Sequence, residues 1–463
     1  MSSVDGLNKT LFEELKRFSI SEKNAVRDHI ISSLYSHAEK IAARVVTRAG
    51  AQADWDRRID DILTSRWLGF PVMLGLLGMA LWLTVAGANY PSQVLAVGLF
   101  WLQDRLTQFF QWAGAPGWLH GLLVMGMYRT VAWVVSVMLP PMAIFFPLFT
   151  LMEDLGYLPR VAFNLDRFFK KAGAHGKQAL TMSMGFGCNA AGVTACRIIE
   201  SPRERLIAIL TNNFVPCNGR FPALIALSAI FAGGAATTYG TVVASAVVTG
   251  IVLTGIAVTF LVSWLLSKTL LRGIPSFFVL ELPPYRKPQI GRVLIRSLLD
   301  RTVFVLGRAV MVAAPAGAIT WILANVRVGE LSILGRIASL LDPVGHAIGL
   351  DGFILTAFIM GLPANEIVLP VLLMGYLSAG SLLKPDSLET LRTVLAGHGW
   401  TWLTALSMML FSLLHFPCGT TLLTIYKETR SLKWTALSLL VPLALAVLVT
   451  FSLARSVRFL GLA

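Results

Sequence analysis

About nine hydrophobic runs, each about 20 residues long, divide most of the chain and constrain its fold more than any other feature. They begin near Trp67, Val131, Gln178, Leu206, Thr241, Val303, Phe353, Thr401 and Thr435. A helix needs about 20 apolar residues to cross roughly 30 Å of hydrocarbon. With 55% hydrophobic and only 14% charged residues, the chain also differs from soluble domains in composition. The sequence therefore predicts an all-α, polytopic membrane protein.

The N-terminal region has a different character. Its first 60 residues are charged and lack the short apolar stretch of a cleaved signal peptide, so we expect a cytoplasmic N-terminus. The segment Ser19-Ile-Ser-Glu22 has capping-box spacing and predicts a helix start. An apolar face follows at helical spacing, formed by Ile30, Leu34, Ile41 and Val45. This face packs either on a preceding helix around Leu11, Leu15 and Phe18 or on another protein, and amphipathicity alone does not decide.

Two further segments have the pattern of helices that lie in the membrane interface. Trp55, Ile59, Leu63 and Trp67 continue at helical spacing and predict an interfacial helix that leads into the first span. A second, weaker run covers residues 94–112 and is interrupted by Asp104 and Arg105. This run is also compatible with an interfacial position.

The net charge of +14 is distributed as in a membrane protein, not as in a nucleic-acid-binding one. Lys and Arg gather at the ends of hydrophobic runs, not on one soluble face. One loop holds Arg160, Arg167, Lys170, Lys171 and Lys177, and another holds Lys268, Arg272, Arg286, Lys287, Arg292 and Arg296. The positive-inside rule places both loops in the cytoplasm. The uncharged loop 232–239 is then expected on the opposite side.

A weak internal repeat organises the membrane region. The stretch Gly185-Phe-Gly-Cys-Asn189 is followed by Phe214-Val-Pro-Cys-Asn-Gly-Arg220, and Gly361-Leu-Pro-Ala-Asn365 by His415-Phe-Pro-Cys-Gly-Thr-Thr421. Interrupted hydrophobic segments at matching positions of two halves point to a transport site near the membrane midplane. The loop charges are satisfied when each first segment enters the membrane and returns on the same side. We therefore predict inverted repeats, with seven full crossings and two re-entrant segments.

Three cysteines are the candidate metal ligands. Cys188, Cys217 and Cys418 lie beside helix-breaking Gly or Pro, whereas Cys196 does not and is interpreted as a packing residue. Thiols are soft donors that suit late first-row transition metals better than Na⁺ or Mg²⁺. The alternative, in which each cysteine is a small buried hydrophobe, remains open. A disulfide framework is not expected, because all four cysteines lie within or at the edge of apolar runs.

No catalytic motif is apparent. The only Gly-Lys pair, at Gly176, is followed by Gln178, and Lys171 stands where a phosphate-binding loop needs its first Gly. The seven histidines show no HExxH or paired helix-face spacing. We therefore expect a protein that is not an enzyme and has no permanently bound cofactor.

At these motifs the chain resembles the membrane region of the ferrous iron transport protein B family (FeoB). The resemblance also covers Leu151-Met-Glu-Asp-Leu-Gly-Tyr-Leu-Pro-Arg160, Pro202-Arg-Glu-Arg-Leu206, Pro363-Ala364 with Glu366, and Lys427-Glu428. It implies two gate (nucleoside-recognition) repeats and uptake of Fe²⁺ across a prokaryotic cytoplasmic (inner) membrane. The expected metal-contacting residues are Cys188, Cys217 and Cys418, with Asn189 and Glu366 as oxygen donors.

The chain departs from the family pattern in three places. Ala190-Ala191-Gly192 follows the first motif where a proline is usual, and Asn365 stands where a lysine is common. The family's GTP-binding domain is not in this sequence. We therefore expect GTP to act only through a partner, a separate small GTPase that docks on residues 1–65. A small cytoplasmic accessory protein of the iron system is a second expected partner, and loss of GTP control is the alternative.

The predicted organisation has six parts. They are a cytoplasmic stalk and interfacial helix (1–65), a first span and amphipathic segment (66–130), a first gate repeat (131–267), a basic cytoplasmic loop (268–302), a second gate repeat (303–425) and a C-terminal span (426–463). Two rival functions stay open: a carrier for a nucleoside or other small solute, and a membrane scaffold that transports nothing.

Overall fold

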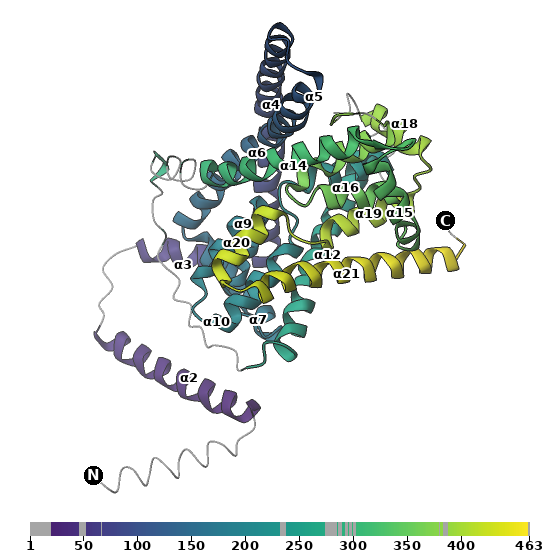
Figure 1. The fold of residues 1–463 in the computed structure, drawn as a ribbon. Helices are drawn as coiled ribbons and strands as arrows, with labels where there is room; N and C mark the ends of the chain where they lie inside the picture. The colour runs from purple at the N-terminus through teal and green to yellow at the C-terminus, as the bar shows by residue number, and fades with distance from the viewer. Residues whose placement is uncertain are drawn as a thin grey trace, which may run out of the picture. The chain divides into compact units, whose positions relative to one another are not determined.

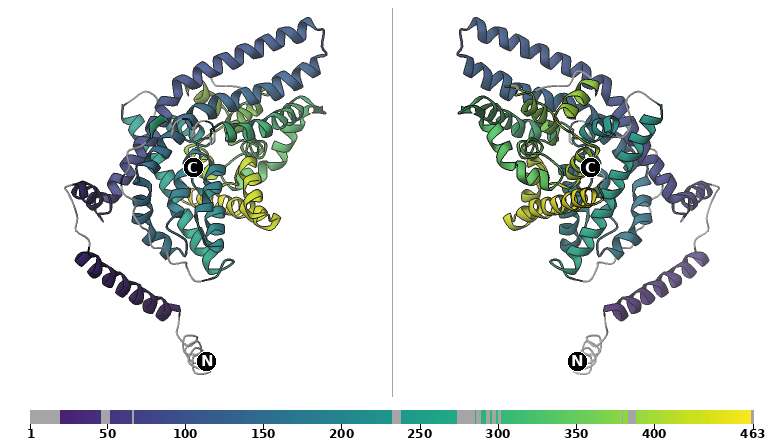
Figure 2. Two further views of the ribbon diagram at one scale, coloured as in Figure 1. Left: turned by 90° about the vertical axis from the view of Figure 1, so that its left-hand side faces the viewer. Right: turned by 90° about the vertical axis from the view of Figure 1, so that its right-hand side faces the viewer.

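The computed structural model covers residues 1–463 and is drawn in Figures 1 and 2. It describes residues 20–45, 52–65, 67–231, 238–273, 285, 289–291, 295, 299, 302–378, 380–382 and 388–461. The chain divides into two units, Met1–Ile62 and Leu63–Ala463.

The first unit is helical. It contains α2 (Ile20–Val45) and most of α3 (Gln52–Leu63). The apolar face expected on α2 is exposed, since Leu34 and Val45 are 65% and 74% accessible. The proposed cap residue Ser19 and the expected packing partners Leu11, Leu15 and Phe18 lie outside the described residues. The expectation of one helix running from Trp55 through Trp67 is wrong, because α3 ends at Leu63 and a turn follows.

The second unit is built almost entirely from helices in its described part. They are α4 (Gly69–Trp112), α5 (Gly117–His120), η1 (Gly121–Tyr128), α6 (Arg129–Asp154), α7 (Tyr157–Lys171), α8 (Gln178–Gly187), α9 (Asn189–Ala195), η2 (Cys196–Ile198), α10 (Pro202–Thr211), η3 (Asn212–Phe214), α11 (Phe221–Phe231), α12 (Thr238–Lys268), α14 (Phe304–Asn325), α15 (Ile333–Ala347), α16 (Gly352–Met360), η5 (Asn365–Ile367), α17 (Val368–Tyr376), α18 (Leu388–Gly397), α19 (Trp402–Leu414), α20 (Gly419–Thr429) and α21 (Leu432–Phe459). Two short antiparallel strands, β1 (Arg327–Val328) and β2 (Leu331–Ser332), form a small hairpin before α15.

Helix α4 corrects the expectation of a separate interfacial segment. It continues for 44 residues through Pro91, so residues 94–112 extend the first hydrophobic helix instead of lying apart from it. The chain then turns back, and the Tyr128 hydroxyl donates to the carbonyl of Leu99 at 2.9 Å. Figure 2 shows the two arms of this long hairpin side by side. The polar residues that suggested an interface are thus carried on a helical hairpin.

The described residues confirm an all-α, multi-pass membrane architecture. Four helical segments are long and apolar enough to cross a bilayer: Gly117–Asp154, Ala246–Lys268, Trp402–Thr429 and Leu432–Phe459. A fifth crossing is possible in the pair Ile333–Ala347 and Gly352–Met360, which is bent by 112°. Among the described residues these four or five candidate crossings are fewer than the seven predicted, because Gly and Pro break several hydrophobic runs into short helices.

The first re-entrant segment is the hairpin α8–α9. Lys177, just before α8, forms an ion pair with Glu200, just after η2, at 3.1 Å. A continuous helix from Lys177 to Glu200 would hold these two residues about 35 Å apart. The segment therefore enters and returns on the same side, as the loop charges predicted.

The second re-entrant segment is the hairpin α16–η5–α17. Asp351 caps the start of α16 by accepting from the backbone nitrogen of Ile354, and its carboxylate also accepts from the hydroxyl of Tyr376 at the end of α17. Both ends of this hairpin therefore lie together too. Among the described residues, each of these two re-entrant hairpins has one helix break at its tip.

The two hairpins enter from opposite ends of the unit. Helix α21 begins beside α20, and Arg458 near its end donates to the carbonyl of His346 in α15. Its 28 residues span about 42 Å, and Figure 1 shows it running from the region of α20 to that of α15. Hairpin α8–α9 has its base near the first end and hairpin α16–α17 near the second. The inverted relation predicted from the sequence is confirmed.

Candidate functional site

The tips of both hairpins have the same construction. Helix α8 ends at Gly187, Cys188 is extended (φ −156°, ψ 125°) and α9 begins at Asn189. In the second hairpin Ala364 is extended (φ −151°, ψ 118°) and the helical turn η5 begins at Asn365. The break forms although Ala190 and Ala191 stand where the resemblance led us to expect a proline, and both alanines lie in the first turn of α9.

Close packing explains the glycine before the first break. A Cβ atom at Gly187 would lie 2.5 Å from Cδ1 of Phe145 in α6. Phe145 therefore packs directly against the backbone that precedes Cys188. Glycine at this position permits both the close approach and the end of α8.

The Pro-Cys segments lie against the hairpin tips. Cys217 lies in an irregular stretch between η3 and α11, and Cys418 is the residue that precedes α20. The backbone nitrogen of Asn218 donates to the carbonyl of Gly187 at 3.4 Å, and that of Gly419 donates to Leu362 at 2.6 Å. Each half therefore holds its Pro-Cys segment next to its own helix break.

Arg220 joins the two halves from the inside. Its side chain is 1% exposed and donates to the carbonyls of Asn213 at 2.8 Å and Leu413 at 2.9 Å. The same guanidinium reaches the carbonyls of His415 and Phe416, each at 3.3 Å. These carbonyls lie at the end of α19, where a cation is favoured by the helix dipole. Arg220 ends the Pro-Cys motif of the first half, but the sequence did not predict this connection.

All five predicted site residues line one small cavity where the two tips and the two Pro-Cys segments meet. Its volume is about 30 Å³, enough for one or two water-sized species. The lining residues are Met138, Gly187, Cys188, Asn189, Cys217, Gly219, Ala309, Pro363, Ala364, Asn365, Glu366, Cys418, Thr420 and Thr421. Residues from both halves, up to 283 positions apart, thus share one site.

Glu366 is placed by contacts with the first half. A Cβ atom at Gly219 would collide with its Oε1 atom, so the carboxylate lies directly over this glycine. The indole nitrogen of Trp133 donates to the backbone carbonyl of Glu366 at 3.2 Å. Arg220 is close enough to Glu366 and Cys217 for charge interaction with both. The cavity therefore carries one acidic side chain with a buried cation nearby.

The two tip asparagines differ in their bonding. The Asn189 amide lies beside Asn213, and the orientation that best satisfies it donates to the carbonyls of Gly185 at 3.2 Å and Val215 at 3.3 Å. By contrast, Oδ1 of the buried Asn365 has no hydrogen-bond partner among the described residues. Asn365 was not among the predicted ligands. Its position in the repeat, matching Asn189, is the signal that could have identified it.

The fourth cysteine is separate from this cavity. Cys196 is fully buried in a small cluster with Val193, Ile199 and Ile425, and its thiol donates to the carbonyl of Gly192 at 3.3 Å. Its predicted role as a packing residue agrees with this position. Within the described ranges, no three His, Cys, Asp or Glu side chains are close enough together to enclose a metal ion. The cavity thus groups the thiols without forming a closed metal site.

Comparison with known proteins shows which proteins the chain is similar to. Residues 135–231 match the family model Gate, described as nucleoside recognition, and residues 248–300 match the model for the ferrous iron transport protein B C terminus. A protein of Staphylococcus aureus named Fe(2+) transporter FeoB is 30% identical over 97% of the chain. A Synechocystis protein of the same name is 28% identical over 99% of the chain and 72% of its own length. The chain belongs to the FeoB family.

The chain corresponds to the membrane region of FeoB proteins. It spans 66% of the length of the Staphylococcus aureus relatives. A Porphyromonas gingivalis protein, 28% identical over 86% of the chain and 51% of its own length, is named as a fusion of Fe(2+) transport protein A and Fe(2+) transporter FeoB. No solved structure matches the chain. The residues matched by the Gate model include the first re-entrant hairpin, α8–α9.

Proposed function

We propose that this protein transports ferrous iron through the cavity lined by Cys188, Cys217 and Cys418. Asn189 and Glu366 serve as oxygen donors in this proposal. The observation that carries it is the convergence of three thiols and one carboxylate from both inverted repeats on a single 30 Å³ cavity. The names of the FeoB relatives support Fe²⁺ as the transported ion.

The chemistry of the cavity suits transient contact with a soft divalent cation. Thiol and carboxylate ligands accept Fe²⁺, and equally Mn²⁺, Co²⁺ or Zn²⁺, so ligand type alone does not select among them. Helix α8 ends at the cavity residue Gly187, and the negative end of its dipole favours a cation there. A cavity of this size requires the ion to lose most of its hydration shell, and the protein donors replace it.

A nucleoside carrier is the second candidate, favoured by the description of the Gate family. The volume argues against it. Ligand pockets for molecules of this size usually measure about 300 Å³ or more, whereas the cavity between the repeats holds about 30 Å³. A dehydrated metal ion fits this space and a nucleoside does not.

The proposal includes location and partners. The basic residues Lys170, Lys177 and Arg197 lie toward the base of the first hairpin, and we assign this end to the cytoplasm of a prokaryotic cell. The exposed apolar face of α2 supports docking of a separate small GTP-binding protein on residues 1–65. The Porphyromonas gingivalis fusion supports a small accessory protein of the transport protein A type as a further partner.

Metal uptake into proteoliposomes tests the function. The purified protein should admit Fe²⁺, measured by quenching of a metal-sensitive dye trapped inside. The triple variant Cys188→Ser, Cys217→Ser, Cys418→Ser should lose this uptake, while Cys196→Ser, which changes a thiol outside the cavity, should retain it. Uptake that survives the triple replacement would refute the thiol-lined site.

A further inference from the structure

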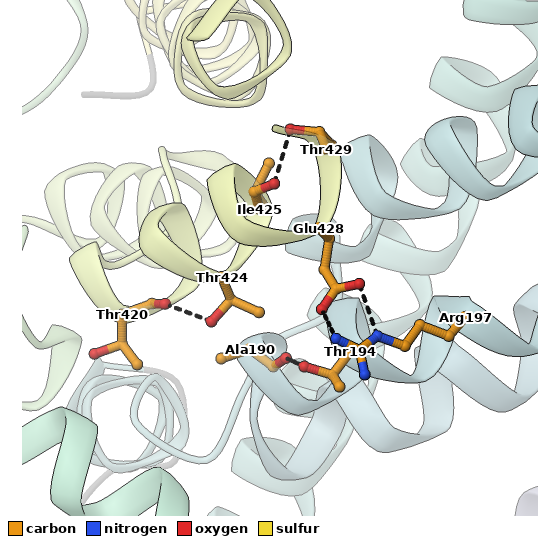
Figure 3. A network of polar contacts seen from close by, with 8 residues as sticks. All are labelled: Ala190, Thr194, Arg197, Thr420, Thr424, Ile425, Glu428 and Thr429. Carbon is orange, nitrogen blue, oxygen red and sulfur yellow. Dashed lines mark hydrogen bonds and ion pairs between the residues drawn. The ribbon is translucent and has the colours of Figure 1, made fainter. Parts of the chain in front are cut away.

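Helices α9 and α20 lead away from the cavity side by side. Cys188 directly precedes α9 and Cys418 directly precedes α20, so both helices begin at cavity thiols. The two helices pack against each other. Beyond the end of α9, Arg197 forms two hydrogen bonds with Glu428 of α20, at 2.8 and 2.7 Å. Figure 3 shows this ion pair across the two helices.

The facing sides of the two helices carry hydroxyl groups. Thr420, Thr424 and Glu428 are spaced by four residues, so they share the face of α20 on which Glu428 meets α9. On the other side, Thr194 precedes Arg197 by three residues and lies on the matching face of its own helical segment. Figure 3 shows Thr424 and Thr194 between the cavity residue Thr420 and the Arg197–Glu428 ion pair.

The threonines combine burial with oxygen atoms that can contact a cation. Thr420 and Thr424 are 6% and 2% exposed. The Thr424 hydroxyl donates to the carbonyl of Thr420 at 2.8 Å, and that of Thr194 donates to Ala190 at 3.0 Å. A hydroxyl that donates its hydrogen keeps acceptor lone pairs. The three threonines therefore offer a cation successive oxygen contacts along an otherwise apolar interface between α9 and α20.

We infer that the α9–α20 interface is the route by which the ion leaves the cavity, and that the Arg197–Glu428 pair closes its outer end. This inference rests on the proposed function, because it gives the thiol cavity an exit toward the basic end of the protein. When the pair separates, Glu428 offers a carboxylate to the emerging cation. When it forms, Arg197 occupies that carboxylate and its positive charge repels the ion.

The strength of the pair suits reversible closure. Arg197 is 67% exposed and Glu428 is 12% exposed, so water screens one partner more than the other. Bidentate guanidinium–carboxylate geometry is strong for an ion pair, but the exposure of Arg197 to water limits what the pair contributes to stability. Breaking this pair is therefore expected to open the interface without unfolding the protein.

Thiol accessibility tests the route without relying on transport. The variant Thr424→Cys places a thiol on the proposed route, and Thr450→Cys is the control away from it. Thr450 is a buried threonine of α21 whose hydroxyl also donates to a carbonyl of the preceding turn. Membrane vesicles of each polarity would react with a charged, impermeant methanethiosulfonate reagent. Peptide mass analysis would locate the label. Thr194→Cys provides a second probe from the α9 side in case Thr424→Cys does not fold.

Breaking the ion pair should change the labelling. In the Arg197→Gln background, Thr424→Cys should react about fivefold faster, from the vesicle face that carries Arg197, while Thr450→Cys should not change. The double variant Arg197→Glu, Glu428→Arg should restore the slow rate. Equal rates at positions 424 and 194 with and without the pair would overturn the inference. Because the readout is covalent labelling, this failure differs from the absence of metal uptake, which would count against the proposed function.

Discussion

Cys188 and Ala364 have nearly the same extended backbone conformation at the tips of the two inverted hairpins, with φ and ψ differing by 5° and 7°. The repeat therefore preserves the helix break but not the side chain. One tip presents a thiol and the other a methyl group to the same cavity. The set of possible metal donors is therefore asymmetric. Thiols lie at one tip and in both Pro-Cys segments, whereas the other tip carries Asn365 and Glu366.

Ala364→Cys should convert a transient site into a retentive one. The new thiol would join those of Cys188, Cys217 and Cys418 in the cavity. Four thiolates form the closed coordination typical of structural Zn²⁺ sites. We expect tighter binding of Zn²⁺ and slower turnover. Titration with a chelator-buffered metal would measure the affinity. Ser412→Cys, which adds a buried thiol in α19 that is not among the cavity-lining residues, is the control; equal affinities in the two variants would contradict the prediction.

Gly219→Ala should disturb Glu366. The added Cβ atom would collide with the Glu366 carboxylate and force it to move. Displacement of a positioned group by about 1 Å can cost up to about a hundredfold in rate, so we expect uptake to fall by about tenfold or more. Gly250→Ala is the matched control, because a Cβ atom there would have no neighbour within 4 Å. Normal uptake by Gly219→Ala would show that the position of Glu366 is unimportant.

The two tip asparagines allow function to be separated from stability. Asn365→Leu removes an Oδ1 atom that has no partner among the described residues, so the unfolding free energy should change by less than about 1 kcal/mol. Asn189→Leu removes an amide that bonds to neighbouring backbone and should cost about 1–3 kcal/mol. If Asn365 contributes an oxygen to the ion, its variant should remain stable in detergent yet transport less metal. A large loss of stability in Asn365→Leu would contradict this assignment.

Much of this arrangement could be predicted from the sequence because local residue patterns encode it. Glycine and proline interrupt the runs at Gly187 and Pro363, and loop charges require each interrupted segment to return to its side. These signals identified the re-entrant hairpins, the inversion and the cavity residues. The helix boundaries near the first span were less accurate, since apolar residues continue through 94–112 and Pro91 does not end α4.

The contacts between the halves left no local signal. Arg197 and Glu428 are 231 positions apart, and nothing near either residue specifies the other. Arg220 donates to backbone carbonyls, which every sequence contains. Its partners at the end of α19 can therefore be recognised only from the packed structure. Such pairings are tertiary consequences of the inverted packing.

Replacing Arg220 should destabilise the protein without any change in the metal donors. Arg220→Gln would leave several buried carbonyls at the interface of the two halves without a donor, and a loss of about 3 kcal/mol is expected. Arg220→Lys should recover part of this loss by keeping the charge. The exposed Arg272→Gln serves as control. Thermal unfolding in detergent measures the effect, and an unchanged midpoint for Arg220→Gln would contradict the connecting role.

His175 predicts how stability depends on pH. It lies in the loop between α7 and α8, where burial lowers the pKa of its imidazole, and the positive charge of Lys177 also lowers it, against the opposing carboxylates of Glu204, Asp166 and Glu200. The unfolded chain, with an ordinary histidine pKa of about 6.5, then binds a proton more readily than the folded protein does. The stability due to neutral His175 is present above that pH and is lost as the pH falls below it.

A single group of this kind changes the unfolding free energy by at most about 1.4 kcal/mol per pH unit. We expect the thermal midpoint to fall between pH 7.5 and pH 5, and His175→Asn to show a smaller fall. Asparagine can still accept the hydrogen bond that the backbone nitrogen of Lys177 donates to Nδ1 at 3.0 Å. His37→Asn, which replaces an exposed imidazole of α2, should leave the fall unchanged. Because the buried imidazole is neutral when the fold is stable, a midpoint that rises on acidification through this range would contradict the assigned environment of His175.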